Sequence, residues 1–139
     1  MSGFLLDTNV VSEMTRDRPN ASVADFLDRE VELWLAVLVI HELQFGLYRT
    51  PRGRRRDQLE ADLRGLLARF ASRTLPLDRP SAEWAARFRA RALGAGRPPS
   101  LADMLIAGTA KANDLAVATR NVRDFEGLDV DVVNPWEPA

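Results

Sequence analysis

The fold is predicted most directly from one apolar run, Leu33-Trp34-Leu35-Ala36-Val37-Leu38-Val39-Ile40. The run is unbroken and rich in valine and isoleucine, which is typical of a strand that is buried on both faces. A strand with one wet face would instead alternate apolar with polar side chains. Residues 33–40 therefore predict an inner strand of a parallel sheet covered by helices on both faces.

Shorter apolar segments are predicted to supply the other strands, at residues 4–6, 74–77, 115–118 and 130–133. Between them, apolar side chains recur at helical spacing. The predicted helices are residues 22–30, 41–48, 54–70, 80–93 and 101–112, with Asn20 or Ser22 and Ser100 as N-caps. This alternation predicts an α/β fold with a mainly parallel sheet. No repeat or long linker divides residues 1–139, so we expect a single domain.

Four acids lie where such a fold collects its ligands, which is beyond the carboxyl ends of the strands. Asp7 directly follows residues 4–6, and Glu42 comes two residues after the run 33–40. Asp124 lies in the loop after residues 115–118. Asp103 is near the start of a helix that is apolar nearly all round. A carboxylate there costs on the order of several kcal/mol unless it is paired or binds a metal.

Each acid also has a structural alternative. Asp7 can form a turn or a helix cap, Glu42 can interact with a helix N-terminus, and Asp103 can cap its helix. Asp124 can pair with one of the two arginines in its own loop. If the four converge, however, their repulsion raises their pKa values unless a cation neutralises them. Oxygen ligands of this kind suit Mg²⁺ or Mn²⁺, and such a metal can activate water and hold a phosphate.

Composition excludes several other classes of site. The 139 residues include no cysteine, which excludes disulfides, thiolate metal sites and cysteine nucleophiles. The single histidine, His41, cannot build a typical zinc site alone, and we assign it no role. No segment approaches the ~20 apolar residues of a membrane span. The first residues lack the basic start of a signal peptide, so we expect a cytoplasmic protein that does not enter a membrane.

The charge is balanced overall but unevenly distributed. The net charge is −1, which indicates no general attraction to nucleic acid, and Lys111 is the only lysine. A basic cluster consists of Arg49, Arg52, Arg54, Arg55 and Arg56. This cluster is either a solvated loop and helix start or a patch that contacts phosphate, because guanidinium groups pair with phosphate oxygens.

Five segments, in this order, resemble the motifs of the VapC-type PIN-domain toxins. They are Leu5-Leu6-Asp7-Thr8-Asn9-Val10, Glu42, Ser100-Leu101-Ala102-Asp103-Met104-Leu105-Ile106-Ala107, Ala118-Thr119-Arg120-Asn121-Val122-Arg123-Asp124-Phe125 and Val133-Asn134-Pro135-Trp136. The resemblance covers essentially the whole chain. It implies a Mg²⁺- or Mn²⁺-dependent ribonuclease toxin, a homodimer, and a cognate antitoxin that pushes a segment into the acidic groove. The toxin would reach operator DNA only through that antitoxin.

The resemblance also implies roles for individual residues. The implied catalytic set is Asp7, Glu42, Asp103, Asp124, Asn121 and Thr119. Asp7, Asp103 and Asp124 would hold the metal, and Glu42 would orient or deprotonate the water or share a second metal. Some family members place an acid where Asn121 stands here, and others use the later acid that Asp124 matches. We expect Asp124 as the fourth ligand, with Asn121 as an auxiliary ligand. Thr119 would support these ligands by hydrogen bonding.

Two alternative functions are compatible with an α/β fold of this kind. One is a PIN-like domain that has lost catalysis and only binds RNA or a partner. The other is a response-regulator receiver, which needs a pair of acids after its first strand and a late lysine. Here Asp7 stands alone after the first predicted strand, and Lys111 lies inside a predicted helix, which argues against a receiver.

Overall fold

A computed structural model describes residues 3–30 and 32–138; positions 1, 2, 31 and 139 of the predicted domain lie outside the described residues. Five parallel strands form one sheet in the order β3-β2-β1-β4-β5. The strands are β1 (Phe4–Leu6), β2 (Leu33–Ala36), β3 (Thr74–Leu75), β4 (Ala116–Ala118) and β5 (Val132–Val133). The chain builds outward from β1 to β3 and then returns to the other side of β1. Ligands bind at such a reversal in open parallel sheets.

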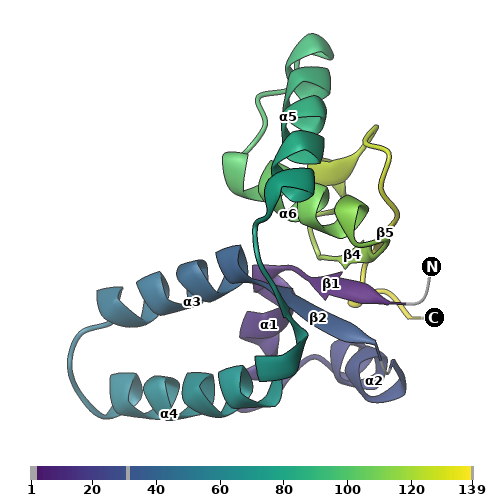
Figure 1. Cartoon of the computed structure of the whole chain (residues 1–139). Helices are drawn as coiled ribbons and strands as arrows, with labels where there is room; N and C mark the ends of the chain where they lie inside the picture. Colours follow the sequence, from purple (N-terminus) through teal and green to yellow (C-terminus); the bar gives the residue numbers. More distant parts are fainter. Residues whose placement is uncertain (1–2, 31, 139) are drawn as a thin grey trace.

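Helices cover both sides of this sheet, as the sequence predicts (Figure 1). They are α1 (Thr8–Met14), α2 (Ala21–Arg29), α3 (Val37–Arg49), α4 (Arg54–Arg69), α5 (Arg79–Gly94) and α6 (Leu101–Ala112), with short 3₁₀ helices η1 (Ala71–Arg73) and η2 (Val122–Phe125). Figure 1 shows α5 and α6 as a pair above the sheet, while α3 and α4 run antiparallel below it. The predicted α/β fold with a parallel sheet is therefore confirmed.

The apolar run 33–40 is not one strand, and this part of the prediction was wrong. β2 ends at Ala36, and α3 begins at the next residue, Val37. Val37 is 40% exposed, so the second half of the run is not buried on both faces. A continuous apolar run does not by itself distinguish a strand from a buried helix. Here the run is divided between the two, and α3 packs against β2, α1 and α6.

The helix α1 was not predicted, because the sequence favoured a polar turn after β1. Instead α1 begins at Thr8, directly after its N-cap Asp7. The helix has only 7 residues, too few for a clear apolar period. The remaining elements lie close to their predicted positions, with differences mainly at their ends. The predicted caps Asn20 and Ser100 are confirmed by side-chain hydrogen bonds to the backbone N–H groups of their helices.

The hydrophobic core combines the strands with buried side chains from α1 to α6, and α6 is buried from Met104 to Ala110 except at Leu105. The pairing of α5 with α6 is close because α6 carries a glycine at the crossing. A Cβ atom at Gly108 would stand 2.4 Å from the carbonyl oxygen of Ser81 and 2.6 Å from the amide nitrogen of Ala85. Across the described ranges, no helix has the length and apolar character needed to cross a membrane.

Candidate active site

Asp7 occupies the junction between β1 and α1 at the carboxyl edge of the sheet. It is 5% exposed, and both of its carboxylate oxygens accept hydrogen bonds. The amide N–H of Thr8 donates to Oδ1 over 2.8 Å, and the hydroxyl of Thr119 donates to Oδ2 over 2.7 Å. Burial raises the pKa of Asp7, and these two hydrogen bonds oppose that rise. Asp7 is thus both a helix cap and a buried carboxylate held in a fixed orientation.

Thr119 connects the end of β4 to Asp7 at the end of β1. Besides donating to Asp7, its hydroxyl oxygen accepts from the side-chain amide of Asn9 over 3.3 Å and from the amide N–H of Asn121 over 3.0 Å. The side-chain oxygen of Asn9 accepts in turn from the amide N–H of Arg120 over 3.2 Å. The loop after β4 is therefore tied to α1 by a small polar network around Asp7. This placement fits the supporting role predicted for Thr119.

Glu42 lies in a helix, as predicted, but one turn further into it than the sequence indicated. It is in the second turn of α3, six positions after the end of β2, because the helix begins at Val37 and not at residue 41. Its Oε1 accepts a 2.8 Å hydrogen bond from the hydroxyl of Thr8. The half-buried carboxylate is therefore linked to the first residue of α1, next to Asp7. Nothing in the sequence motif around Thr8 indicated Glu42 as its partner.

Asp103 and Asp124 complete the group from the other side of the sheet. Asp103 is the third residue of α6, whose N-cap Ser100 accepts from the Asp103 amide N–H over 3.3 Å. Burial raises the pKa of Asp103 to about 7, and the charges of Asp7, Asp124 and Glu42 add to the rise. A hydrogen bond with the Asp124 side chain also keeps the proton on Asp103. Asp124, on η2, is exposed.

The four predicted acids therefore lie within electrostatic reach of one another. Each of Asp7 and Asp103 has its pKa raised by the charges of Glu42 and Asp124. Within residues 3–30 and 32–138, none of the four forms an ion pair with an arginine, lysine or histidine. In particular, the pairing of Asp124 with Arg120 or Arg123 that the sequence allowed is absent from this part of the chain. Among the described residues, the negative charge of the four acids is therefore left without a counter-ion.

The donor set fits a hard divalent cation. Carboxylates that repel one another and lack a basic partner are the ligands that Mg²⁺ and Mn²⁺ prefer. Among the described residues, no three or more His, Cys, Asp or Glu side chains are drawn together tightly enough to form a ready-made metal cage. Without a cation between them, like charges favour such separation. The arrangement is a negatively charged site that a cation would stabilise.

Asn121 lies in the loop after β4, next to the network around Thr119. Its contact with the network is through the backbone, since its amide N–H donates to the hydroxyl of Thr119. The residue is exposed and is the N-cap position of η2, without a side-chain capping bond. Asp124, in contrast, is coupled to both Asp7 and Asp103. This coupling is the reason to expect Asp124 as the fourth ligand, which stays a prediction.

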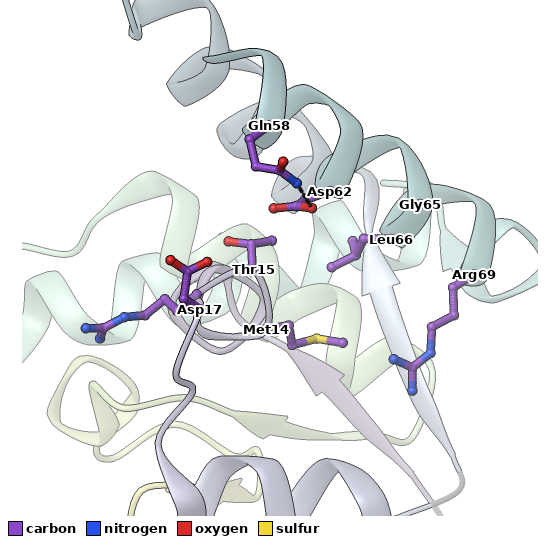
Figure 2. A pocket seen from close by; sticks show the side chains of 9 residues that line it. Met14, Thr15, Asp17, Gln58, Asp62, Gly65, Leu66 and Arg69 are labelled. Carbon is purple, nitrogen blue, oxygen red and sulfur yellow. Dashed lines mark hydrogen bonds between the residues drawn. The ribbon is translucent and has the colours of Figure 1, made fainter. Parts of the chain in front are cut away.

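A groove lies at the far end of α1 from Asp7, between the segment after α1 and the face of α4. Figure 2 shows part of it, with Gln58 and Asp62 of α4 opposite Thr15 and Asp17. This part encloses about 420 Å³, and an adjoining part of about 1100 Å³ extends to the start of α4. Of the predicted basic cluster, Arg54 and Arg55 line the second part, with Arg16 and Arg18 on the opposite wall.

Residues 4–130 match the family model described as the PIN domain. The chain belongs to the PIN-domain family. This PIN domain is 40% identical over 137 residues to the plasmid stability protein StbB of Pseudomonas syringae pv. tomato, with 96% of this chain and 99% of the relative covered. It is 38% identical over 139 residues to the VapC ribonuclease Y4jK of Sinorhizobium fredii, with coverage of 98% and 99%.

The same likeness extends to solved structures. The PIN domain matches a chain in the structure of FitAB bound to an IR36 DNA fragment with a TM-score of 0.91 and 36% identity, covering 98% of this chain and 97% of that chain. The family that the sequence motifs indicated is thereby confirmed, and the described fold is the fold of that family.

Proposed function

We propose that this PIN domain is a ribonuclease toxin of a toxin–antitoxin pair, and that it hydrolyses RNA phosphodiester bonds at Asp7, Glu42, Asp103 and Asp124 with Mg²⁺ or Mn²⁺. One observation carries the proposal: four carboxylates from separate elements lie in mutual electrostatic reach with no basic partner in the described part of the chain. The activity named for the relative Y4jK, a VapC ribonuclease, supports the choice of RNA.

A bound Mg²⁺ or Mn²⁺ would supply charge neutralisation at the phosphate and would lower the pKa of water. Asp7, Asp103 and Asp124 are the residues that would hold it, because Asp7 is fixed by two hydrogen bonds and the charges of Asp7 and Asp124 both act on Asp103. Glu42, anchored by Thr8, would orient the attacking water and accept its proton. The water oxygen then forms a bond to phosphorus, one ester bond breaks, and the leaving oxygen takes up a proton.

The arginine-lined groove gives the RNA strand a path away from these acids. It begins where α1 ends, and the 7-residue α1 is about 10 Å long, so it connects the groove to Asp7. No ion pair is formed by Arg18, Arg54 or Arg55 within the described ranges. Arginines in the first turn of α4 also lie at the positive end of the helix dipole, which is unfavourable for a cation. A bound phosphate would offset this repulsion. These features favour phosphate contact over a merely solvated loop.

The proposal includes the partners that the family resemblance implies. A cognate antitoxin would neutralise the enzyme by filling the acidic site, and the toxin would form a homodimer in the cytoplasm. Operator DNA would be reached only through the antitoxin. The solved FitAB complex with DNA supports this arrangement by analogy with a chain of 36% identity.

The first test is cleavage of a mixed RNA pool by partner-free protein, with and without Mn²⁺ or Mg²⁺, beside the Asp103→Asn variant. We expect metal-dependent cleavage by the natural protein and none by the variant. Circular dichroism should show that both proteins are folded. Folded protein that binds RNA and metal but cleaves nothing in the pool would instead favour the alternative of a binding module. A second pool of folded transfer and ribosomal RNAs distinguishes that alternative from a narrow substrate range.

A further inference from the structure

Arg120 is placed at the edge of the acidic site by two contacts of its own and one contact of its neighbour Thr119. Its amide N–H donates to the side-chain oxygen of Asn9 over 3.2 Å, and the side-chain amide of Asn9 donates to Asp7 over 3.4 Å. Its guanidinium carbon lies 5.1 Å from the centre of the Trp136 ring. Its neighbour Thr119 donates to Asp7. The backbone of Arg120 is therefore fixed relative to Asp7, and its side chain rests on an aromatic ring.

The ring that supports Arg120 is itself held in place. The amide N–H of Trp136 donates to the side-chain oxygen of Asn134 over 2.9 Å, which closes a turn around the buried Pro135. Trp136 is half-buried and packs against the hydrophobic core. Because this turn follows β5, it lies at the carboxyl edge of the same parallel sheet, next to the end of β4. The stack thus stands at the same edge as the acids.

The guanidinium of Arg120 has no acidic partner among residues 3–30 and 32–138. The residue is exposed. A guanidinium that lies against a ring still presents its edge N–H groups, which match two oxygens of a phosphate. The guanidinium lies on the Trp136 ring and outside ion-pair distance of the four carboxylates, whereas the backbone of Arg120 is tied to Asp7 through Asn9.

We propose that Arg120, held on the Trp136 ring and tied to Asp7 through Asn9, binds a phosphate of the RNA strand at the acidic site. This inference rests on the proposed ribonuclease function and adds a substrate-binding residue to it. The cation offsets the repulsion between the RNA backbone and the acids on the side of the site formed by β4 and β5. Trp136 is then a positioning residue, because it acts on the substrate only through Arg120.

The test compares Arg120→Gln with a matched control, Arg87→Gln. Arg87 stacks on Trp84 in the same manner, with 4.9 Å from its guanidinium carbon to the ring centre, but it lies on α5. Binding is measured with a labelled single-stranded RNA pool in the Asp103→Asn background, and cleavage in the natural background. We expect Arg120→Gln to weaken binding about 10- to 100-fold and to reduce the salt dependence by about 0.7 in log–log slope. Arg87→Gln should change neither.

Trp136 is tested through its conservative variant. Trp136→Phe should keep most of the RNA binding because a ring remains, whereas Trp136→Leu should lose binding to the same extent as Arg120→Gln. The double variant that combines Trp136→Leu with Arg120→Gln should lose no more than either single variant. The inference would be overturned if Arg120→Gln bound RNA as tightly as the protein with Arg120 and with the same salt slope. It would also be overturned if a lower melting temperature fully explained the loss of binding. Natural protein that neither binds nor cleaves RNA would instead contradict the proposed function itself.

Discussion

The hydroxyl of Thr119 donates a 2.7 Å hydrogen bond to Oδ2 of Asp7, across 112 positions of sequence. This bond joins the carboxyl ends of two neighbouring strands, β4 and β1, at the point where the strand order reverses. The same hydroxyl oxygen accepts from Asn9 and Asn121, so its single donor and both acceptor sites are used. The orientation of the buried carboxylate is therefore set by a residue outside the group of acids.

Replacing Thr119 by valine should weaken metal binding without removing an acid. Valine has a similar shape but no hydroxyl, so Asp7 loses a hydrogen bond that lowers its pKa. Loss of such a supporting contact typically reduces metal affinity about 10- to 100-fold. We expect this reduction in a calorimetric Mn²⁺ titration, and a similar loss of RNA cleavage. Thr119→Ser keeps the hydroxyl and should stay near the natural affinity; equal behaviour of the two variants would contradict the role given to Thr119.

The raised pKa of Asp103 predicts that the metal-free protein becomes less stable as pH increases. The pKa is about 7 in the folded chain and 3.8 in the unfolded chain. Between these values the folded state binds more protons, so the free energy of unfolding falls as pH rises from about 4 to 7 and is level above that. Asp7, whose pKa is also raised, contributes in the same direction. Urea unfolding at pH 4.5, 6 and 8 without divalent metal measures the effect.

The Asp103→Asn variant provides the control for this pH dependence. An amide does not titrate, so the variant should be more stable than the natural protein at pH 8, by about 2 kcal/mol, and nearly equal to it at pH 4.5. Addition of Mn²⁺ at pH 8 should stabilise the natural protein and leave the variant almost unchanged. A natural protein whose stability rises from pH 4.5 to 8 would show that Asp103 is not the repelled carboxyl described above.

The sequence predicted the positions of three of the four acids more successfully than it predicted the start of the helix that carries the fourth. As expected, Asp7 follows β1, Asp103 lies in the first turn of α6, and Asp124 lies in the segment after β4. Apolar segments and turns mark these junctions clearly in the sequence. Glu42 was expected in the first turn of a helix that begins at residue 41 but lies in the second turn of α3, which begins at Val37. The reason is that side chains 33–40 are apolar throughout, so the sequence pattern does not reveal that the backbone changes from β2 to helix at Val37.

Other parts of the site depend on contacts between distant segments. The hydrogen bond from Thr8 to Glu42 spans 34 positions, and the stack of Arg120 on Trp136 joins two different loops. Local propensity contains no information about such pairs, since they form only when the parallel strands bring their carboxyl ends to one edge. The motif around Trp136 was noticed in the sequence, but its contact with Arg120 is visible only in the structure.

The position of the arginine-lined groove predicts how RNA binding depends on salt concentration. The double variant Arg54→Ala with Arg55→Ala should weaken RNA binding and lower the log–log salt slope by about 1.4, which is two single-strand phosphate contacts. Because both arginines lie in the first turn of α4, their removal should not destabilise the protein. The matched control is Arg89→Ala with Arg91→Ala, two exposed arginines on α5. If both double variants change the slope equally, the groove has no special role and only net charge matters.

The contact between α5 and α6 predicts opposite effects for two glycine-to-alanine changes. At Gly108 a methyl group would meet backbone atoms of Ser81 and Ala85 at 2.4 and 2.6 Å, and neither atom is the end of a flexible side chain. The helices must therefore move apart, which should cost about 1–3 kcal/mol or more and loosen the helix that carries Asp103.

At Gly65, in the middle of α4, a Cβ atom meets nothing within 4 Å. Alanine there should stabilise the protein by about 0.5–1 kcal/mol, because it reduces the freedom of the unfolded chain. Chemical denaturation of both variants at pH 7 measures the difference. Two variants of equal stability would show that α5 and α6 are not packed as closely as described.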